Sequence, residues 1–439
     1  MNLIDCNLAL KGGVTSGLVH AGAVPELARH YRFLSVAGSS AGAIAAAFTA
    51  GAEYARSRGD DDGFMRLSQH SAELPSRLLG LFQPSPGLDG LARALVHLAP
   101  GTGRARVISA ILCFWPALLT GFLSGVAAWL LLAGHTDFVR RLIGGLILGT
   151  CGAAVGLGLQ TAIILRRVAR LNFGICSGLS RESRPALTDW LHDCLQDIAF
   201  GRERDRAPLT FGDLENAGID LRIVATNLST GRGEITPDLG RGYSFRPAEW
   251  ARQFPEAVMA HLTHGRSDAV LSIPSTAELP VLVALRMSLA CPGLLEATPA
   301  IGEGGARVWF SDGGLTTNFP FGAFDEDTRP TLALDLDTIQ PGQTVEPRVR
   351  VFDPATDNSP PDLITLRGFA WSLLVALREG HLRTAARRPE RTAHIYQARL
   401  RPDEGGMNLD MTAAEAVALM KHGAELGALV IKTELTQTP

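Results

Sequence analysis

A serine at the centre of a glycine-framed pentapeptide is the first residue in the chain that could carry chemistry. Gly38-Ser39-Ser40-Ala41-Gly42 has the pattern Gly-x-Ser-x-Gly, with Ser40 in the middle. On a sharp turn between a strand and a helix, such a serine is lifted out of the sheet above a helix N-terminus. Small neighbours are needed because the turn brings backbones close together. We predict that Ser40 is a nucleophile supported by Gly38 and Gly42, and that Ser39 is a turn or capping hydroxyl.

A glycine-rich loop, Gly12-Gly13-Val14-Thr15-Ser16-Gly17, precedes this serine. Acyl transfer needs donors for the developing oxyanion, and the free backbone N–H groups of such a loop can supply them. A nucleotide-binding loop is the alternative. However, the lysine of a P-loop follows its glycines whereas Lys11 precedes them, and the Rossmann spacing of glycines is absent. We predict an oxyanion hole at the start of the loop and a supporting role for its last glycine: Gly12, Gly13, Val14 and Gly17.

An acidic residue follows much later, in Asp312-Gly313-Gly314, after the strand-like run at residues 307–311. A carboxylate at a strand end on a glycine turn can face a neighbouring strand end and accept a proton there. The alternative is a simple Asp-Gly turn in which Asp312 is a cap. We predict that Asp312 is the base and that Gly313 and Gly314 support its turn.

Alternating strands and helices are expected to position these three motifs. An apolar run at residues 3–10, helical spacing at 18–30, a strand at 33–37 and an Ala-rich helix at 43–55 predict a βαβ start. Further strands are expected at 220–226, 308–311 and 331–336. The sequence therefore predicts an α/β sheet fold.

The order of these motifs resembles the patatin-like phospholipase family, in its bacterial type with an inserted hairpin. Three more segments are similar to that family: Val224 to Gly231, Leu285 to Leu294 (LRMSLACPGL) and Gly313 to Pro320 (GGLTTNFP). The resemblance covers most of residues 3–337 and is interrupted by the hairpin.

The resemblance implies a three-layer sandwich with a mostly parallel central sheet, and a Ser-Asp dyad. Ser40 would attack a lipid ester, Asp312 would take its proton directly, and N–H groups near Gly12 to Val14 would hold the oxyanion. An acyl-enzyme would follow, without a cofactor or a metal. The family usually has a third glycine and a basic residue where this chain has Val14 and Ser16. A β-branched residue does not easily take positive φ, although Val14 still offers its N–H.

Two long uncharged stretches interrupt the catalytic part. No charged residue lies between Val107 and Ala133 or between Leu142 and Leu165. Each stretch exceeds the roughly 20 residues that cross a bilayer core. A pair of buried core helices is the alternative, but globular cores rarely need two such runs in succession. We predict a transmembrane hairpin at residues 104–170 that contacts the lipid bilayer through residues 107–165.

The second stretch is rich in glycine, with Gly145-xxx-Gly149 and Gly152-xxx-Gly156. This spacing lets helices approach closely in lipid. The neighbouring helix is either the first span or a second subunit, which leaves a homo-oligomer open. Pro116 predicts a kink near the start of the first span.

The basic residues favour both ends of the hairpin on the cytoplasmic side. Only Arg140 and Arg141 lie in its turn, whereas five arginines flank it: Arg104, Arg106, Arg166, Arg167 and Arg170. We therefore expect an integral protein of the cytoplasmic membrane, with its catalytic part in the cytoplasm.

Length and composition agree with this organisation. The 439 residues exceed one ordinary domain, and 46% are hydrophobic against 19% charged. The net charge of -3, without a basic run, argues against nucleic-acid binding. The six cysteines are dispersed along the chain, and we expect them to be buried thiols in a reducing compartment. The first residues lack the features of a signal peptide, so we expect them to enter the fold directly.

The expected divisions are a first catalytic part at 1–103, the hairpin at 104–170, a second catalytic part at 171–350 and a C-terminal helical extension at 351–439. A Pro- and Asp-rich break at 352–362 is expected to end the sheet, and helices are expected at 363–384 and 413–430.

Other titratable residues are expected to be structural. A Ser-Asp-His order is formally available, but no motif surrounds the late histidines, His381, His394 and His422. Asp335 and Asp337 are expected to form a strand-end turn, and Asp60-Asp61-Asp62 lacks the spacing of a metal site.

The sequence thus favours an enzyme, a lipid acyl hydrolase that cleaves carboxylic esters of glycerophospholipids. Two alternatives remain: a catalytically weak membrane scaffold with the same fold, and a serine esterase that acts on a non-lipid ester.

Overall fold

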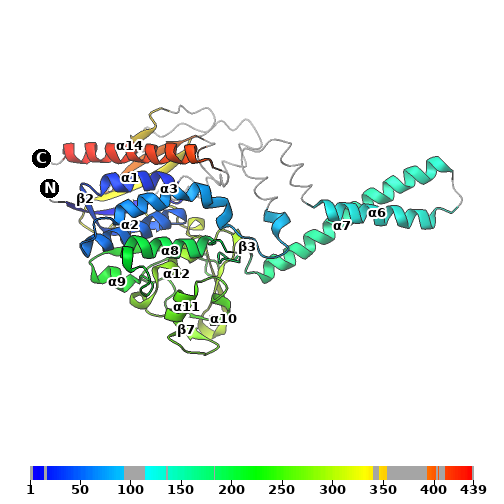
Figure 1. The fold of residues 1–439 in the computed structure, drawn as a ribbon, viewed down its shortest axis with the longest axis horizontal. Coiled ribbons are helices and arrows are strands. Elements are labelled where there is room, and N and C mark those ends of the chain that lie inside the picture. Colours follow the sequence, from blue (N-terminus) through cyan, green and yellow to red (C-terminus); the bar gives the residue numbers. More distant parts are fainter. Residues whose placement is uncertain are drawn as a thin grey trace. The chain divides into compact units, whose positions relative to one another are not determined.

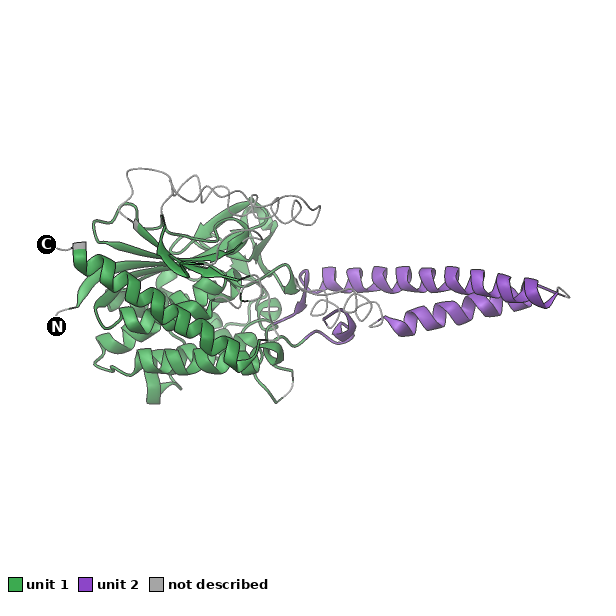
Figure 2. Ribbon diagram, turned by 90° about the horizontal axis from the view of Figure 1, so that it is seen from above, with its two compact units in different colours: residues 1–83, 178–439 green, residues 84–177 purple. Residues whose placement is uncertain are grey.

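The computed structural model describes residues 3–13, 17–92, 114–134, 137–181, 183–339, 346–352, 393–401, 404 and 411–437. The chain divides into two compact units, drawn in different colours in Figure 2. The first unit consists of residues 1–83 and 178–439, and the second of residues 84–177.

The first unit is an α/β structure built on one large sheet, which has eleven strands among the described residues. The main path, in spatial order, is β12 (Val349–Val351), β13 (Ala393–Leu400), β11 (Thr331–Thr338), β1 (Ile4–Leu10), β2 (Tyr31–Ser39), β4 (Asp220–Asn227), β10 (Arg307–Ser311), β9 (Thr298–Ile301), β6 (Ser244–Phe245) and β7 (Leu271–Ser272). A further strand, β5 (Arg232–Ile235), pairs with β4. The five strands β13, β11, β1, β2 and β4 are parallel. The expected α/β class with a largely parallel sheet is confirmed.

The helices of this unit include those that separate β1 from β2 and β2 from β4 in βαβ order. They are α1 (Leu18–Leu27), α2 (Ala41–Ser57), α3 (Gly63–Leu81), α8 (Leu187–Phe200), α9 (Phe211–Asn216), α10 (Pro247–Trp250), α11 (Glu256–Thr263), α12 (Val281–Ser288) and α14 (Ala413–Gln437), with a short strand β8 (Gly293–Leu295) after α12. The strands expected at 3–10, 33–37, 220–226, 308–311 and 331–336 are all present, as are the helices expected at 18–30 and 43–55.

The C-terminal part differs from the expected helical extension. Residues 393–400 form β13, which runs parallel to β11 inside the central sheet, and β12 pairs with it. The Pro- and Asp-rich break therefore does not end the sheet. The helix expected at 413–430 is present as α14, whereas the one expected at 363–384 lies outside the described residues.

Helix α14 lies along α1 at close range (Figure 1). A Cβ added at Gly22 would lie 1.9 Å from the Met420 carbonyl oxygen, and one at Gly423 would lie 1.9 Å from that of Val19. Glycine is needed at both positions because the two backbones are in contact. This packing joins the end of the chain to the first βαβ unit.

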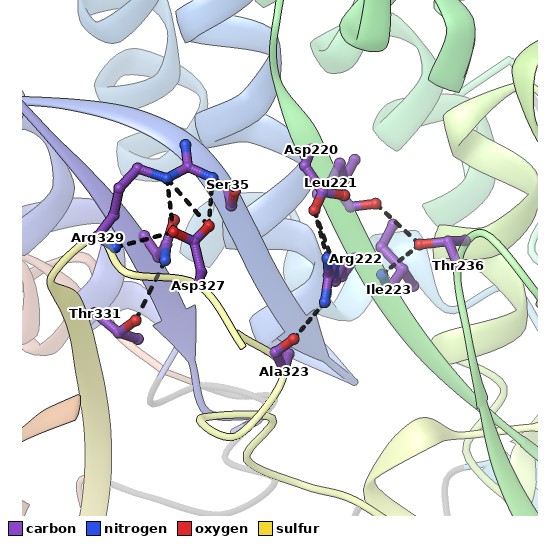
Figure 3. Close-up of polar contacts among 11 residues, drawn as sticks. Ser35, Asp220, Leu221, Arg222, Ile223, Thr236, Ala323, Asp327, Arg329 and Thr331 are labelled. Carbon is purple, nitrogen blue, oxygen red and sulfur yellow. Dashed lines mark hydrogen bonds and ion pairs between the residues drawn. The ribbon is translucent and has the colours of Figure 1, made fainter. Parts of the chain in front are cut away.

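Polar contacts away from the motifs hold the strands of the sheet together (Figure 3). Arg329, just before β11, pairs with Asp327 and donates to the Ser35 hydroxyl on β2, 3.0 Å away. Arg222 on β4 donates to the Ala323 carbonyl. These contacts connect β2, β4 and the segment that leads from β10 to β11, so they fix the strands whose other ends carry the motifs.

The second unit contains two helices, α6 (Trp115–Leu132) and α7 (Phe138–Arg170), and the short strand β3 (Gly174–Cys176). Both helices are long and apolar enough to span a membrane, and only 6% of α6 and 11% of an 18-residue apolar stretch of α7 are buried. Their large side chains are exposed, with Leu131 at 87% and Phe138 at 78%. Such an apolar surface is rare on a soluble protein.

The glycines of α7 pack against α6. A Cβ added at Gly152 would lie 2.1 Å from the Gly121 carbonyl oxygen, and one at Gly156 would lie 2.5 Å from that of Ala117. The close neighbour of these two glycines is thus α6. Pro116 lies in the first turn of α6, where a missing N–H breaks no helical bond, so the expected kink is wrong.

Candidate active site

Ser40 occupies a strained turn between β2 and α2. Its backbone has φ 54° and ψ -133°, a combination that a residue with a side chain rarely adopts. Such strain costs about 1–3 kcal/mol and persists only where the surroundings impose it. Here the N–H of Ser40 donates to the Ser288 hydroxyl, 2.9 Å away, and its carbonyl accepts from the Ala43 N–H at 2.8 Å. The turn is therefore held from both sides.

The glycines around Ser40 are required by close backbone contacts. A Cβ added at Gly38 would lie 2.2 Å from the Gly42 carbonyl oxygen, and one at Gly42 would lie 2.5 Å from that of Leu10. No side chain fits at either position. This agrees with the sequence argument that the turn needs small residues beside the serine.

The register of the sheet brings Ser40 and Asp312 to the same level. Ser39 on β2 pairs with Val224 on β4, and Ser311 on β10 pairs with Thr226. β2 is parallel to β4, so Ser40, which follows Ser39, lies level with Ala225. β10 is antiparallel to β4, so Asp312, which follows Ser311, lies level with the same residue. The serine and the aspartate thus follow the ends of the two strands, β2 and β10, that flank β4.

The side chains of Ser40 and Asp312 are in direct contact. The Ser40 hydroxyl donates to Oδ2 of Asp312 at 2.8 Å. Oδ1 of the same carboxylate accepts from the Gly314 N–H at 2.7 Å, and the Asp312 carbonyl accepts from the Thr226 hydroxyl at 2.8 Å. Ser40 is 5% exposed and Asp312 is 9% exposed. A shielded serine on an oriented carboxylate has the geometry of a nucleophile with its base.

The aspartate turn also depends on close backbone approach. A Cβ added at Gly313 would lie 2.1 Å from the Val224 carbonyl oxygen and 2.6 Å from the Ser39 hydroxyl. Glycine at 313 thus lets the turn lie against β4. The Ser39 hydroxyl is buried and has no hydrogen-bond partner among the described residues, so the expected capping role is not what the structure gives it.

The glycine-rich loop is tied to the segment after Asp312. The Gly12 N–H donates to the Asn318 carbonyl at 2.9 Å, and the Asn318 amide donates back to the Gly12 carbonyl at 3.2 Å. The expectation that the Gly12 N–H serves the oxyanion is therefore corrected, because the Asn318 carbonyl accepts it. Gly12 instead allows close approach, since an added Cβ would lie 3.0 Å from that of Ser40.

The rest of the loop is only partly described. Gly13 follows Gly12, Val14 lies outside the described residues with Thr15 and Ser16, and Gly17 precedes the first turn of α1. A further source of donors lies on the other side of Ser40. The first N–H groups of α2, at Ala41 and Gly42, have no acceptor within the helix and carry the positive end of its dipole.

A buried ion pair anchors the start of the loop. Lys11 lies 2.7 Å from Oδ1 of Asp335, which also accepts a 2.7 Å hydrogen bond at Oδ2 from Gln397. The His20 ring nitrogen Nε2 lies 2.9 Å from the Lys11 carbonyl, and burial lowers the pKa of His20 to about 4. His20 is therefore neutral near pH 7. Asp335 lies within β11 and holds Lys11, so it does not form the strand-end turn that the sequence suggested.

The late histidines have partners elsewhere. His394 on β13 lies 2.6 Å from Glu434, and His422 on α14 lies 3.6 Å from Glu425. His381 lies outside the described residues. Among the residues that the structure describes, no group of three His, Cys, Asp or Glu side chains is placed to hold a metal ion.

Two residues at this site were not singled out from the sequence. Ser288, the last residue of α12, and Asn318, after the aspartate turn, are both almost fully buried, at 0% and 1% exposure. Both lie in segments that the family resemblance had already marked, LRMSLACPGL and GGLTTNFP. The two segments could be recognised from the sequence, but a single sequence does not show which residue of each segment contacts the Ser40 turn or the glycine-rich loop.

Comparison with known proteins leaves the family open. No protein-family model matches the chain. A protein of Rhizobium meliloti (strain 1021) described as an "RpoH suppressor" is 29% identical, over 96% of this chain and 82% of that protein. That description names no reaction. The chain is thus similar to this protein along nearly its whole length.

Proposed function

We propose that the chain is a membrane-anchored serine lipid acyl hydrolase of patatin-like fold. It cleaves carboxylic esters of glycerophospholipids, as a phospholipase A or lysophospholipase does. The observation that carries the proposal is the 2.8 Å hydrogen bond from the Ser40 hydroxyl to Asp312, at a serine held with φ 54° between a strand and a helix. The three-layer arrangement expected from the family belongs to the same proposal.

In the proposed mechanism, Ser40 Oγ attacks the ester carbonyl while its proton passes to Asp312. Asp312 then gives that proton to the departing alcohol oxygen, and the acyl group remains on Ser40. Water attacks the acyl-enzyme, gives a proton to Asp312 and releases the fatty acid, and the proton returns to Ser40. Gly13 and Val14, with the first N–H groups of α2, are the proposed donors to the oxyanion.

The hairpin supports a membrane substrate. The apolar run of α7 from Leu142 to Leu165 rises about 36 Å, which exceeds a hydrocarbon core of about 30 Å. Arginines bound this run on both sides, at Arg140 and Arg141 and at Arg166 and Arg167. We propose that the hairpin crosses the cytoplasmic membrane with the catalytic unit on the cytoplasmic side, where anchoring raises the local substrate concentration.

The test uses the full chain, purified in detergent, with a phospholipid substrate. Ser40→Ala and Asp312→Asn are each expected to abolish fatty-acid release. Ser39→Ala is the matched control, because it removes a neighbouring buried hydroxyl that has no hydrogen-bond partner among the described residues. Full activity in either dyad variant would show that the dyad assignment is wrong.

A fluorophosphonate probe separates the hydrolase from the two alternatives. Labelling that depends on Ser40 supports the hydrolase, whereas an unreactive Ser40 in folded protein favours a scaffold. Hydrolysis of soluble short esters with no release from phospholipid would favour an esterase with a non-lipid substrate.

A further inference from the structure

The peptide group between Lys11 and Gly12, at the start of the glycine-rich loop, is held from both sides. Its carbonyl oxygen, on Lys11, lies 2.9 Å from Nε2 of His20. A carbonyl only accepts, so Nε2 carries the hydrogen of this contact. The N–H of the same peptide, on Gly12, donates to the Asn318 carbonyl at 2.9 Å. Neither end of this peptide is left for a substrate.

The next peptide group, between Gly12 and Gly13, is held on one side. Its carbonyl oxygen, on Gly12, accepts from the side-chain amide of Asn318 at 3.2 Å. The peptide is trans, and a planar trans peptide points its N–H opposite to its carbonyl. The Gly13 N–H therefore points away from the Asn318 amide. It has no acceptor among the residues that the structure describes.

The Gly13 N–H belongs to a residue at the edge of the nucleophile turn. Gly12 packs against this turn, because an added Cβ would lie 3.0 Å from that of Ser40 and 2.6 Å from the Ser39 carbonyl oxygen. Gly12 is buried, whereas Gly13 is partly exposed. A donor at the border between the buried turn and solvent is accessible to the carbonyl oxygen of a bound ester.

The segment that carries Asn318 is fixed to the strand that leads into the loop. Phe319, the next residue, belongs to a buried cluster with Ala9 on β1 and Ala333 on β11. Asn318 itself is 1% exposed. The amide that holds the loop is thus anchored by the same strand from which the loop emerges.

The two contacts of Asn318 with Gly12 have different tasks. The Asn318 backbone carbonyl attaches the loop, and a substitution of the side chain leaves that bond in place. The side-chain amide binds the carbonyl of the following peptide and so sets the direction in which the Gly13 N–H points. The side chain therefore controls the orientation of one peptide group, separately from the attachment of the loop.

We propose that Asn318 is a positioning residue of the active site, whose side-chain amide orients the Gly12-Gly13 peptide so that the Gly13 N–H is presented to the oxyanion. The inference rests on the hydrolase function proposed above and deepens it. In the step concerned, Ser40 Oγ forms a bond to the ester carbonyl carbon, the carbonyl electron pair moves to its oxygen, and the serine proton goes to Asp312. The negative oxygen then meets a donor that was oriented before the substrate arrived.

Loss of the amide is expected to slow the chemical step and to leave ester binding nearly unchanged. Without it the peptide can rotate, and a carbonyl oxygen turned toward the oxyanion would repel it. Asn318→Ala and Asn318→Leu both remove the donor, and leucine keeps a side chain of similar size in the buried position. Each is expected to lower kcat between about fivefold, for one neutral hydrogen bond, and about a hundredfold, for an oxyanion donor, with little change in KM.

The experiment uses the detergent-purified full chain and nitrophenyl acetate. Rates are divided by the amount of Ser40 that a fluorophosphonate labels at completion, so that misfolded protein is not counted. The second readout is the Ki of an alkyl trifluoromethyl ketone, which forms a tetrahedral oxyanion with the serine and mimics the transition state. Its Ki is expected to rise by the factor by which kcat falls. A merely structural role of Asn318 would lower the labelled amount and leave both constants unchanged.

Thr317→Ala is the matched control. It removes a partly exposed hydroxyl from the neighbouring residue and leaves both bonds between Asn318 and Gly12 in place. Wild-type kcat and Ki are expected in this variant. A fall in kcat with a matching rise in Ki in the two Asn318 variants, and not in Thr317→Ala, would support the positioning role.

The opposite outcomes distinguish this role from the hydrolase proposal. Wild-type kcat and Ki in both Asn318 variants, with hydrolysis that still depends on Ser40, would overturn the positioning role and leave the hydrolase standing. A higher KM with unchanged kcat would do the same, because it would mean that Asn318 serves ester binding. Absence of both Ser40-dependent hydrolysis and ketone binding in the wild type would overturn the hydrolase, and the role of Asn318 with it.

Discussion

The backbone N–H of Ser40 donates to the hydroxyl of Ser288 at 2.9 Å, although 248 positions separate the two residues. The last residue of α12 thus holds the strained turn of the proposed nucleophile. We predict that Ser288→Ala lowers kcat for Ser40-dependent hydrolysis about fivefold with little change in KM, because one hydrogen bond contributes about 1 kcal/mol. Steady-state kinetics on a soluble ester measure both constants.

The control for this variant is Ser68→Ala, which removes a hydroxyl bound to the Phe64 carbonyl within α3. A merely structural role of Ser288 would lower the amount of folded protein without slowing the reaction of the folded fraction with a fluorophosphonate. Unchanged kcat and labelling rate in Ser288→Ala would remove the positioning role.

Gly12 is predicted to tolerate no side chain. A Cβ there would lie 2.5 Å from the Asn318 side-chain oxygen and 2.6 Å from the Ser39 carbonyl oxygen. Gly12→Ala is expected to lower kcat/KM at least a hundredfold, because the loop must move away from Ser40. Gly80→Ala is the matched control, since nothing lies within 4 Å of its Cβ, and it is expected to be active. Equal activity of the two variants would contradict the close packing of the loop.

Stability is predicted to fall in acid through His20. Its pKa in the folded chain is lowered by burial from 6.5 to about 4. Between these values the unfolded chain binds more protons, so the free energy of unfolding falls as pH drops from 6.5 to 4, by up to about 3 kcal/mol. Above pH 6.5 this contribution is absent. Urea unfolding of the wild type and of His20→Gln at pH 7 and pH 4.5 measures it.

The other titrating groups are the same in both proteins, so the comparison isolates His20. Among them are Glu53, whose pKa is raised by burial, and Asp327, whose pKa is lowered to about 2 by its hydrogen bond with Arg329. The variant is expected to lose less stability than the wild type on acidification. An equal loss in the two proteins would show that His20 is not buried in the neutral form.

The hairpin is predicted to cross the bilayer. Asp137 precedes α7 in the turn between the two helices. In right-side-out vesicles, a membrane-impermeant maleimide is expected to label Asp137→Cys, in a Cys151→Ser background. It should label Ser57→Cys, at the end of α2, only after permeabilisation. Labelling of both residues only after permeabilisation would mean that the hairpin does not reach the far side.

The sequence predicts the parts of the fold that local pattern controls. The strands before the loop and before the serine turn, and the Ala-rich helix after it, follow from apolar runs, glycine turns and helix propensity. β13 was missed because its place depends on pairing with β11, and the Pro- and Asp-rich break before it resembles a domain end. Strand pairing across a long separation leaves little trace in one sequence.

The residues of the candidate site likewise fall into those that a local sequence pattern predicts and those that it does not. Ser40 and Asp312 were found because their glycine turns have a sequence pattern, and the register around β4 brings them together. Ser288 and Asn318 act through contacts across 248 and 306 positions, which no local pattern encodes. The Gly12 N–H was assigned to the oxyanion because its Asn318 acceptor is visible only in three dimensions.

The central claim is that Ser40 and Asp312 work as a dyad. The most direct measurement is fatty-acid release from phospholipid vesicles, followed by mass spectrometry, with the reconstituted wild type, Ser40→Ala, Asp312→Asn and Ser39→Ala. The account predicts release by the wild type and by Ser39→Ala, and a loss of at least a thousandfold in the two dyad variants. Release at the wild-type rate by Asp312→Asn or Ser40→Ala would contradict it.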